Sequence, residues 1–419
     1  MITDALVIGA GTAGLATATR LAQGGLRVLV AAAGEGSLPL AGGTIDVLGY
    51  GPGPVETPLS ALPVFVEANL GHPYELLTSP EELAECLEWF RRLTGPLGYI
   101  GDLSRNHWVP TLLGGLRPAG LLPLTMAAGD LSRGGEVVIA GIRGFRDFHS
   151  PLMASNLSQA TAPAGAAIEA RAVELAWPGP ASDLAPFRVA QRLEDPEIRR
   201  QLAAQLRPHL GRADAVGMPP ILGRARTAEV HADLQQRLER RVFETPGLPP
   251  SLPGLRLFDR LRQALREAGG RLVLGSKAVA AMRDGRAIRS VTITQASRAV
   301  PVNARVFVLA TGGFGTGGIV RDQHGGLSEP IFDLPVAGPA DRPQPFGTEY
   351  FSDHPLELAG VSADARGRPL GVDGIPFADN LYAAGAILAG ARPWREKSGE
   401  GISLATAYRA AASILRGES

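Results

Sequence analysis

Three glycines near the start of the chain have the spacing that a dinucleotide-binding turn requires. Gly9, Gly11 and Gly14 follow the apolar run "ALVI", and a helix-forming stretch begins among them at Thr12 and Ala13. In such a turn the first glycine allows a sharp bend, the second lets a phosphate approach the backbone, and the third lets helix and strand pack closely. The free N–H groups of the helix start favour an anion. The motif predicts a nucleotide phosphate site formed by Gly9, Gly11, Thr12, Ala13 and Gly14. The alternative is that the glycines serve packing alone.

The acidic residue that would hold an adenosine ribose is absent from its usual place. It is expected about 20 residues after the first glycine, at the end of the second strand. Ala31, Ala32 and Ala33 occupy that place, and Glu35 follows them in a turn. A charged hydrogen bond to a ribose hydroxyl contributes about 1.5–3 kcal/mol. A ligand with a phosphate but no adenosine ribose does not need this bond, so the alanines favour FMN; FAD stays possible through another ribose contact.

Three later stretches place small residues where a flat cofactor ring needs room. "LPLAGGTIDVLG" offers backbone donors and a hydroxyl in a loop, "VLATGGF" ends an apolar strand, and "GEGISLATA" opens the last helix. Bare N–H groups and the positive dipole end of that helix suit the charge of a reduced flavin. The candidate cofactor-binding residues in these stretches are Gly42, Gly43, Thr44, Thr311, Gly312, Gly399 and Gly401.

Arg256, in "LPPSLPGLRLFDRL", is the candidate catalytic residue. It lies where an inserted region is expected to return to the nucleotide fold, and such junctions suit a cleft. Its guanidinium would bind a substrate anion or the charge of a reduced flavin; the alternative is an ordinary structural ion pair. The histidines lack metal-ligand spacing, so we expect no metal site.

The elements that must position these residues follow an α/β pattern. Residues 4–32 read as strand, helix, strand, and residues 136–250 alternate apolar strands with helical stretches. A further helix is expected over 79–93, and the tail returns to a helix, strands and a closing Ala-rich helix. The fold class predicted is α/β, with a Rossmann-like flavin domain of the FAD/NAD(P)-binding type and an inserted α/β domain.

The domain boundaries follow from the same pattern. We expect a discontinuous flavin-binding domain made of residues 1–60 and 250–419. Residues 61–249 form the inserted α/β region, which ends at the Pro-rich linker "TPGLPPSLPG".

Composition excludes several classes of function. Lys+Arg and Asp+Glu both number 41, so no overall field attracts nucleic acid or anionic lipid. Cys86 is the only cysteine, which excludes an intrachain disulfide and an iron–sulfur cluster held by this chain alone. Neither a signal-peptide pattern nor an apolar run approaching the ~18 residues of a membrane span is present. We expect a cytoplasmic protein that reaches a membrane only through a partner.

The order of these motifs resembles the superfamily of fumarate reductases and related two-domain flavoproteins. Within it, the whole chain is most similar to the B-subunit family of anaerobic glycerol-3-phosphate dehydrogenases. The stretches that carry the resemblance are "AGGTIDVLG", "HPYELL", "VVIAGIRGFRDFH", "LPPSLPGLRL", "GGIVRDQHGGLSEPI" and "NLYAAGAILAG". The resemblance adds Gly385, in the last of these, to the cofactor-binding residues. It implies FMN in this chain, a partner A-subunit with FAD, and an iron–sulfur C-subunit that docks the assembly peripherally at the inner membrane.

The leading interpretation is therefore a flavoprotein subunit of a glycerol-3-phosphate dehydrogenase. It would help move two electrons from sn-glycerol 3-phosphate towards quinone, yielding dihydroxyacetone phosphate. One alternative is a self-sufficient flavin dehydrogenase or reductase acting on another small substrate. A second is a non-catalytic electron-relay or structural subunit whose own flavin meets no substrate.

Overall fold

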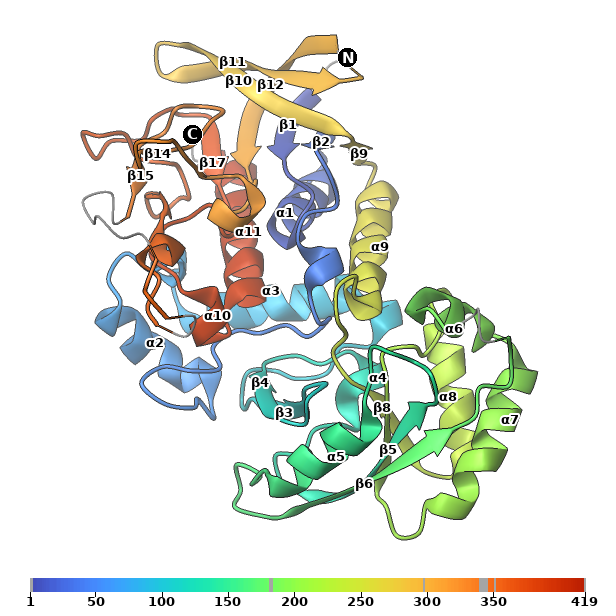
Figure 1. Cartoon of the computed structure of the whole chain (residues 1–419). Coiled ribbons are helices and arrows are strands. Elements are labelled where there is room, and N and C mark those ends of the chain that lie inside the picture. Colours follow the sequence, from blue (N-terminus) through green and yellow to red (C-terminus); the bar gives the residue numbers. More distant parts are fainter. Residues whose placement is uncertain (1–2, 181–183, 297, 339–345, 350–351, 418–419) are drawn as a thin grey trace. The chain divides into compact units, whose positions relative to one another are not determined.

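The chain folds into two compact units (Figure 1). The computed structural model describes residues 3–180, 184–296, 298–338, 346–349 and 352–417. Unit 1 consists of Met1–Leu38, Leu59–Leu93 and Phe258–Ser419, and unit 2 consists of Pro39–Pro58 and Thr94–Leu257.

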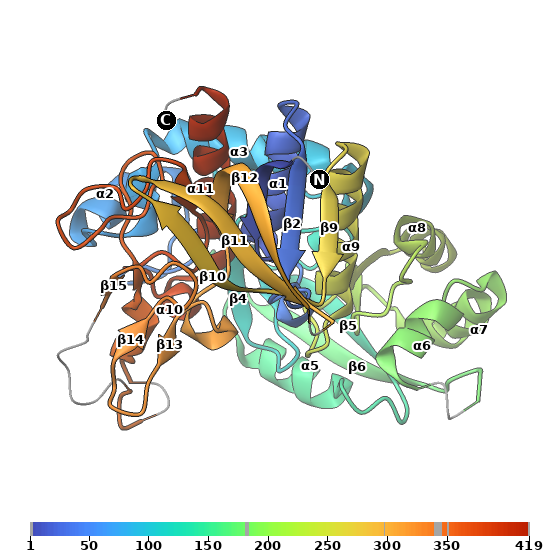
Figure 2. The ribbon, with the colours of Figure 1, turned by 90° about the horizontal axis from the view of Figure 1, so that it is seen from above.

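Unit 1 is built on a sheet whose strands, within the described residues, number seven. β12 pairs in parallel with β1 and β17, β1 pairs in parallel with β2, and β2 pairs in parallel with β9. Figure 2 labels β12, β2 and β9, which follow one another across this sheet. The bounds are β1 Thr3–Ile8, β2 Val28–Ala32, β9 Arg271–Leu274, β10 Ser276–Asp284, β11 Ala287–Gln295, β12 Arg298–Leu309 and β17 Leu381–Ala383.

β12 pairs antiparallel along its first half and parallel along its second half. Its first half runs antiparallel to β11, with Arg298 opposite Gln295, and β11 in turn pairs with β10. Its second half runs parallel to β1, with Leu309 opposite Ile8. All six residues of β1 are buried, as expected for a central parallel strand covered on both faces. The parallel pairing brings the carboxyl ends of β1 and β12 together at one edge of the sheet.

Helices cover this sheet. α1 connects β1 to β2 and packs against α11, and α11 also packs against α3. The α-helices in the described part of unit 1 are α1 Thr12–Gln23, α2 Pro58–Ala68, α3 Pro80–Leu93, the short α10 Pro393–Glu396 and α11 Gly399–Leu415. A further helix, α9 Leu252–Glu267, begins in unit 2 and continues into unit 1. Short two-stranded ladders are formed by β13 Val320–Arg321 with β14 Leu327–Ser328, and by β15 Val336–Ala337 with β16 Gly360–Val361.

Unit 2 has its own parallel sheet, in the order β6-β5-β7-β8. α5 packs against β5 and β6, α8 packs against β8, and α7 packs against α8. A separate β3–β4 ladder belongs to the same unit. The bounds are β3 His107–Pro110, β4 Leu116–Ala119, α4 Leu124–Ala127, β5 Gly135–Ile142, α5 Ser150–Gln159, β6 Ile168–Leu175, α6 Pro186–Arg192, α7 Pro196–Leu206, β7 Ala215–Met218, α8 Thr227–Leu238 and β8 Arg241–Glu244.

The predicted α/β class is confirmed, with a Rossmann-like parallel sheet in unit 1. The strand–helix–strand start, the helix over 79–93 and the closing helix all form as expected. α2 is not among the helices that the sequence predicts. It contains Pro63, which has no N–H for the helix ladder, so the local pattern does not reveal it.

The two units differ in extent from the boundaries expected from the sequence. Residues 59–93 pack in unit 1, because α3 in this segment lies against α11. Residues 39–58 pack in unit 2, where Ile45 bridges to Leu121 and the Asn106 side chain donates to the carbonyls of Leu48 and Val55. A local pattern does not say which unit a segment joins, so long-range contacts decide the place of both segments.

Candidate functional site

The turn between β1 and α1 contains glycines of two kinds. Gly9 has φ +114°, and a Cβ on it would lie 2.1 Å from the carbonyl oxygen of Ala310. A Cβ on Gly14 would lie 2.0 Å from the carbonyl oxygen of Gly9. Close backbone packing therefore requires glycine at both positions. A Cβ on Gly11 would meet no atom within 4 Å, so packing within the protein does not explain this glycine. In a dinucleotide-binding turn, the second glycine leaves room for a phosphate.

Gly11 is also the residue from which α1 begins. It is the N-cap of α1 with extended backbone angles and makes no side-chain cap, while Thr12 and Ala13 form the buried first turn. The N–H groups of this first turn have no acceptor within the helix. Gly36 packs against the start of this helix, because a Cβ on it would lie 2.9 Å from the Cα of Gly11. The predicted phosphate residues thus form an open, uncapped helix N-terminus.

Thr311 lies two residues beyond the end of β12, at the same edge of the sheet. The N–H of Ala310, the preceding residue, donates to the carbonyl of Ile8 at 2.9 Å, which places Thr311 next to the glycine turn. The Thr311 hydroxyl is buried, and no hydrogen-bond partner for it exists among the described residues. Gly312 has φ +77°, and a Cβ there would collide with the Thr316 hydroxyl at 2.1 Å. A buried unpaired hydroxyl is costly unless a ligand satisfies it, so Thr311 fits a bound polar group.

The C-terminal tail brings further predicted residues to α1. Gly385 has φ +82°, and a Cβ on it would lie 2.7 Å from the Cβ of Ala13. Its N–H donates to the Thr406 hydroxyl on α11 at 2.8 Å. Gly399 and Gly401 form the first turn of α11, whose N-cap makes no side-chain cap. Unit 1 therefore joins predicted residues from three distant parts of the sequence.

The end of β2 carries no polar side chain. Ala31 and Ala32 are buried at 2% and 4% exposure, and Ala33 is exposed. Glu35 lies beyond the strand and is half-buried. The place of a ribose-binding acid is thus occupied by methyl groups, as the sequence predicts.

The loop with Gly42, Gly43 and Thr44 lies in unit 2, and contacts within that unit account for its residues. A Cβ on Gly43, at φ +88°, would lie 2.5 Å from the Cβ of Pro253, and one on Gly42 would lie 3.0 Å from Pro246. The buried Thr44 hydroxyl donates to Asp46 at 2.9 Å. Asp46 in turn pairs with Arg117.

Arg256 also lies in unit 2, on the first turns of α9, and is part of a buried ion pair. Its Nη1 pairs with Glu244, whose side chain is fully buried, and its Nε donates to the carbonyl of Gly223 at 2.9 Å. The Thr125 hydroxyl donates to the same carboxylate at 2.6 Å. These contacts support the structural ion-pair alternative for Arg256. Its substrate role stays a proposal.

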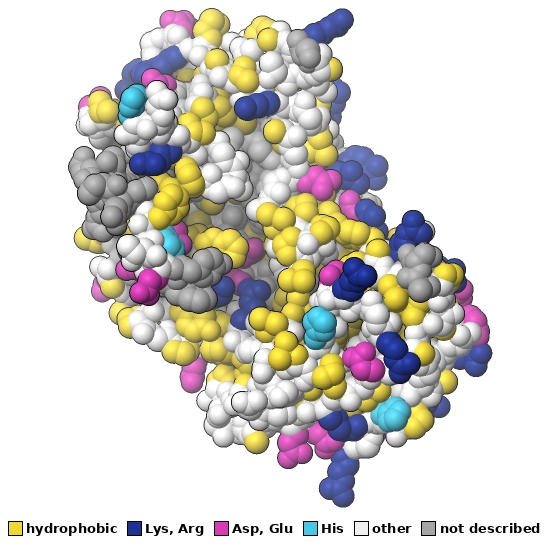
Figure 3. Space-filling view, in the orientation of Figure 1, with side chains coloured by type: hydrophobic (Ala, Val, Ile, Leu, Met, Phe, Trp, Pro, Cys, Tyr) yellow, Lys and Arg dark blue, Asp and Glu magenta, His cyan; other side chains and the backbone are white. Residues whose placement is uncertain are grey.

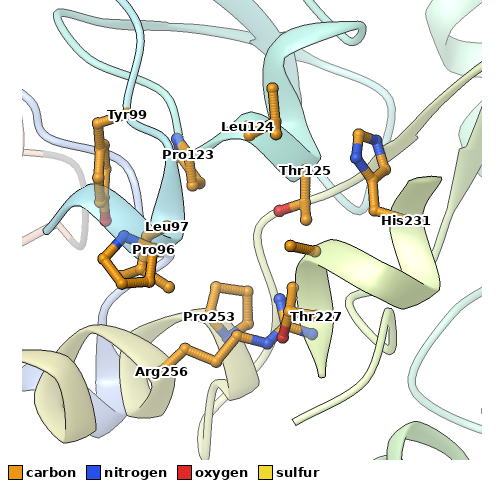
Figure 4. A pocket seen from close by; sticks show the side chains of 11 residues that line it. Pro96, Leu97, Tyr99, Pro123, Leu124, Thr125, Thr227, His231, Pro253 and Arg256 are labelled. Atoms are coloured by element: carbon orange, nitrogen blue, oxygen red, sulfur yellow. The ribbon is translucent and has the colours of Figure 1, made fainter. Parts of the chain in front are cut away.

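Figure 4 shows a pocket of unit 2 that Arg256 lines. Thr125 and His231 contribute polar atoms to it, and the Nε2 of His231 hydrogen-bonds to the carbonyl of Val242 at 2.8 Å. The remaining lining residues are Pro96, Leu97, Tyr99, Pro123, Leu124, Thr227, Ala228 and Pro253. Prolines and leucines dominate, so the pocket is mainly apolar.

A buried polar cluster in unit 1 was not predicted from the sequence. His72, in the "HPYELL" stretch, pairs with Glu396, whose carboxylate also accepts a hydrogen bond from Ser398. Glu396 and Ser398 lie just before α11. The sequence signal is weak, because 324 positions separate His72 from Glu396.

The surface charges of the molecule are mixed in sign. On the face in Figure 3, basic and acidic side chains are interspersed. The described residues contain no cluster of histidine, cysteine and carboxylate groups that could hold a metal ion. Nor do they contain a helix with the length and apolar character needed to cross a membrane.

Comparison with known proteins identifies the family. The family model described as "FAD binding domain" matches residues 4–402. The probable B-subunit of the anaerobic glycerol-3-phosphate dehydrogenase of Halobacterium salinarum is 34% identical over 97% of this chain and 96% of its own length. The corresponding B-subunit of Pectobacterium atrosepticum is 33% identical over 99% of this chain and 98% of its own. The chain belongs to the B-subunit family of anaerobic glycerol-3-phosphate dehydrogenases. The predicted resemblance is confirmed.

Membership in this FAD-binding group identifies a flavin as the class of cofactor, and the family as one of flavin-dependent oxidoreductases. Among solved structures, 3-ketosteroid delta1-dehydrogenase from Sterolibacterium denitrificans aligns over 99% of this chain and 100% of its own, with a TM-score of 0.46 and 12% identity. A structural similarity with this TM-score and this sequence identity identifies no function.

Proposed function

We propose that this chain is the flavoprotein subunit of a multi-subunit glycerol-3-phosphate dehydrogenase that passes electrons to quinone. The observation that carries the proposal is the open Gly11 at the uncapped start of α1, in a chain related over its full length to B-subunit proteins. An uncapped helix start beside the buried, unpaired Thr311 hydroxyl suits a phosphate-bearing flavin.

The flavin we propose is FMN, with FAD as the weaker ligand. The support is the end of β2, where Ala31 and Ala32 offer no hydrogen bond to an adenosine ribose. An adenosine bound there would leave its ribose hydroxyls without the charged acceptor that FAD and NAD sites usually supply. FMN has no such group, so it loses nothing at this position.

In this proposal the chain's own residues bind and orient the cofactor. The first-turn N–H groups of α1 hold the phosphate, and Gly11 leaves it room. The Thr311 hydroxyl donates to a polar edge of the ring, and the N–H groups at Gly399 and Gly401 stabilise negative charge on it. When bound, the flavin accepts the two electrons that convert the secondary alcohol of sn-glycerol 3-phosphate into the ketone of dihydroxyacetone phosphate. Gly312 and Gly385 complete the proposed set of cofactor-binding residues in unit 1.

Partner chains are part of the proposal. The relatives are named as the B-subunit of their enzyme, which supports a complex with further chains. We propose a FAD-containing A-subunit and an iron–sulfur C-subunit, with the membrane reached only through a partner and this chain on the cytoplasmic side. Cys86, the only cysteine, leaves this chain unable to hold a cysteine-ligated cluster.

A second candidate is an electron-relay subunit whose flavin meets no substrate. The contacts of Arg256 favour this candidate, because its guanidinium already forms an ion pair with Glu244 and a hydrogen bond to the carbonyl of Gly223. In this case substrate oxidation takes place on a partner chain, and this chain only transmits electrons.

Anaerobic mixing of the purified, flavin-loaded chain with sn-glycerol 3-phosphate separates the candidates. If the substrate bleaches the flavin bands when this chain is the only protein present, the chain oxidises the substrate directly. Bleaching only after the partner chains are added supports the relay. A purified chain that contains no flavin, and takes up neither FMN nor FAD, would contradict both.

A further inference from the structure

Arg117, on β4 in unit 2, uses only part of its capacity to donate hydrogen bonds. Its Nη2 forms an ion pair with the buried carboxylate of Asp46. Its Nε is buried without a hydrogen-bond partner among the described residues, and its Nη1 donates to none of them. A guanidinium carries five N–H groups in a fixed fork, and a buried N–H without an acceptor is costly. The unused nitrogens of Arg117 therefore suit an acceptor that the chain itself does not supply.

Arg256, the arginine that the sequence favours for a substrate, differs from Arg117 in this respect. All three nitrogens of its guanidinium have acceptors: Nε and Nη2 donate to the carbonyl of Gly223, and Nη1 pairs with Glu244. The Arg256 side chain is 5% exposed, whereas the Arg117 side chain is 19% exposed. Of these two arginines, Arg117 is the one that an anion from solution can reach.

Tyr50 provides a second donor near Arg117. Burial raises the pKa of the Tyr50 phenol, and the charge of Arg117 acts on it in the opposite direction, so the two side chains lie within electrostatic reach of each other. The phenol is protonated at neutral pH and can donate a hydrogen bond. Its ring packs edge-on against Trp108, with centroids 6.3 Å apart, which fixes its position. Tyr50 is half-buried, so its side chain is accessible in part.

The "AGGTIDVLG" loop orients Arg117 and leaves room beside it. The Asp46 carboxylate accepts from the Thr44 hydroxyl at 2.9 Å and from Arg117, so it holds the guanidinium by one nitrogen. Gly42 is half-buried, and a Cβ on it would lie 3.3 Å from the Nη1 of Arg117. Glycine at this position therefore leaves the unused Nη1 uncovered.

We propose that Arg117 and Tyr50 bind the phosphate of sn-glycerol 3-phosphate in unit 2. The proposal rests on the proposed function, because that function makes glycerol 3-phosphate the substrate. A phosphate monoester carries about 1.5 to 2 negative charges at neutral pH and has strong acceptor oxygens. The planar fork of an arginine and a phenol O–H match such a group. In this proposal the two side chains determine specificity for a phosphate ester, and Asp46 positions Arg117.

Tyr50→Phe and Arg117→Met test the two donors. The flavin-loaded chain is titrated in a calorimeter with sn-glycerol 3-phosphate, with inorganic phosphate and with glycerol. We expect Arg117→Met to weaken the binding of both phosphate compounds about tenfold or more, the scale of one charge-assisted hydrogen bond, and Tyr50→Phe to weaken it a few-fold. Any affinity for glycerol should not change, because glycerol has no phosphate. Arg133→Met, at an exposed position of the same unit, is the matched control and should bind like wild type.

A further variant guards against misfolding, because Arg117→Met leaves the buried Asp46 without its counter-ion. Arg117→Met/Asp46→Asn removes both charges and should show the same loss of phosphate binding, while Tyr50→Phe leaves the ion pair intact. The inference is overturned if these variants bind glycerol 3-phosphate as tightly as wild type, if Arg133→Met weakens binding equally, or if the flavin-loaded wild-type chain binds no phosphate compound. The flavoprotein function survives each of these results. A chain that takes up neither FMN nor FAD contradicts the proposed function and, with it, this inference.

Discussion

Gly11→Val should remove the flavin and leave the fold intact. A side chain at Gly11 meets no protein atom near its Cβ, so it fills only the space that the phosphate needs. Gly14→Val is the matched control. Its Cβ would lie 2.0 Å from a backbone oxygen, so we expect this variant to lose about 1–3 kcal/mol of stability. Flavin content and thermal unfolding of both variants provide the measurement. Stoichiometric flavin in a folded Gly11→Val protein would exclude Gly11 from the site.

Ala32→Glu should improve FAD binding without changing FMN binding. The new carboxylate stands at the end of β2, where an adenosine ribose would be held, and a charged hydrogen bond of about 1.5–3 kcal/mol corresponds to roughly a tenfold or greater gain in affinity. Ala33→Glu, one residue further at an exposed position, is the control and should change neither affinity. Chromatography of the cofactor released from wild-type protein tests the same argument. Release of FAD would show that another group holds the ribose.

At the scale of elements, the Arg256–Glu244 ion pair joins α9 to β8 in unit 2. Arg256→Met leaves the buried Glu244 carboxylate without its counter-ion, and removal of one partner of such a pair costs about 3–5 kcal/mol. The double variant Arg256→Met/Glu244→Gln should recover much of this loss. Denaturant unfolding measures the free energy of unfolding of the single and of the double variant. Unchanged stability of Arg256→Met, together with slower flavin reduction by glycerol 3-phosphate, would instead assign Arg256 to the substrate.

Asp130 ties the start of β3 to the turn before β5. Its carboxylate accepts from the N–H of Trp108 at 3.0 Å and lies 2.9 Å from His107 Nδ1 and 2.8 Å from Arg105. Burial works to raise the pKa of Asp130, but the hydrogen bonds from His107 and Trp108 and the charge of Arg105 hold it well below its usual range.

A carboxylate with a lowered pKa stabilises the fold above its unfolded pKa of about 3.9 and loses that effect as the pH falls towards the folded value. Asp130→Asn should therefore be about 1–3 kcal/mol less stable than wild type at pH 7, with a difference that shrinks below pH 4. Urea unfolding at several pH values measures it. Asp284→Asn, at an exposed pair with Arg289, is the control and should cost little. A difference that does not vary with pH would exclude the charge as its source.

At the scale of the whole molecule, we expect this chain alone not to reduce a quinone with glycerol 3-phosphate. Its single cysteine, Cys86, is buried, and burial raises the pKa of the thiol, so it offers neither a cluster ligand set nor a reactive thiolate. Quinone reduction should appear when a FAD-binding chain and a cysteine-rich chain are co-purified with it. Full activity of the isolated chain would favour a self-sufficient dehydrogenase.

The sequence by itself determined what depends on local spacing. The β1–α1–β2 unit, the amphipathic α3 and the uncharged end of β2 follow from neighbouring residues, because strand and helix periods and glycine spacing are properties of short segments. The tertiary structure alone decided which glycines serve packing and which leaves room for a ligand, since that depends on atoms such as the Ala310 carbonyl, which is remote from Gly9 along the chain. It also decided that Ser398 and the distant His72 both hydrogen-bond to Glu396. Hydrogen bonds between distant segments leave no period in the sequence, so only the folded chain reveals them.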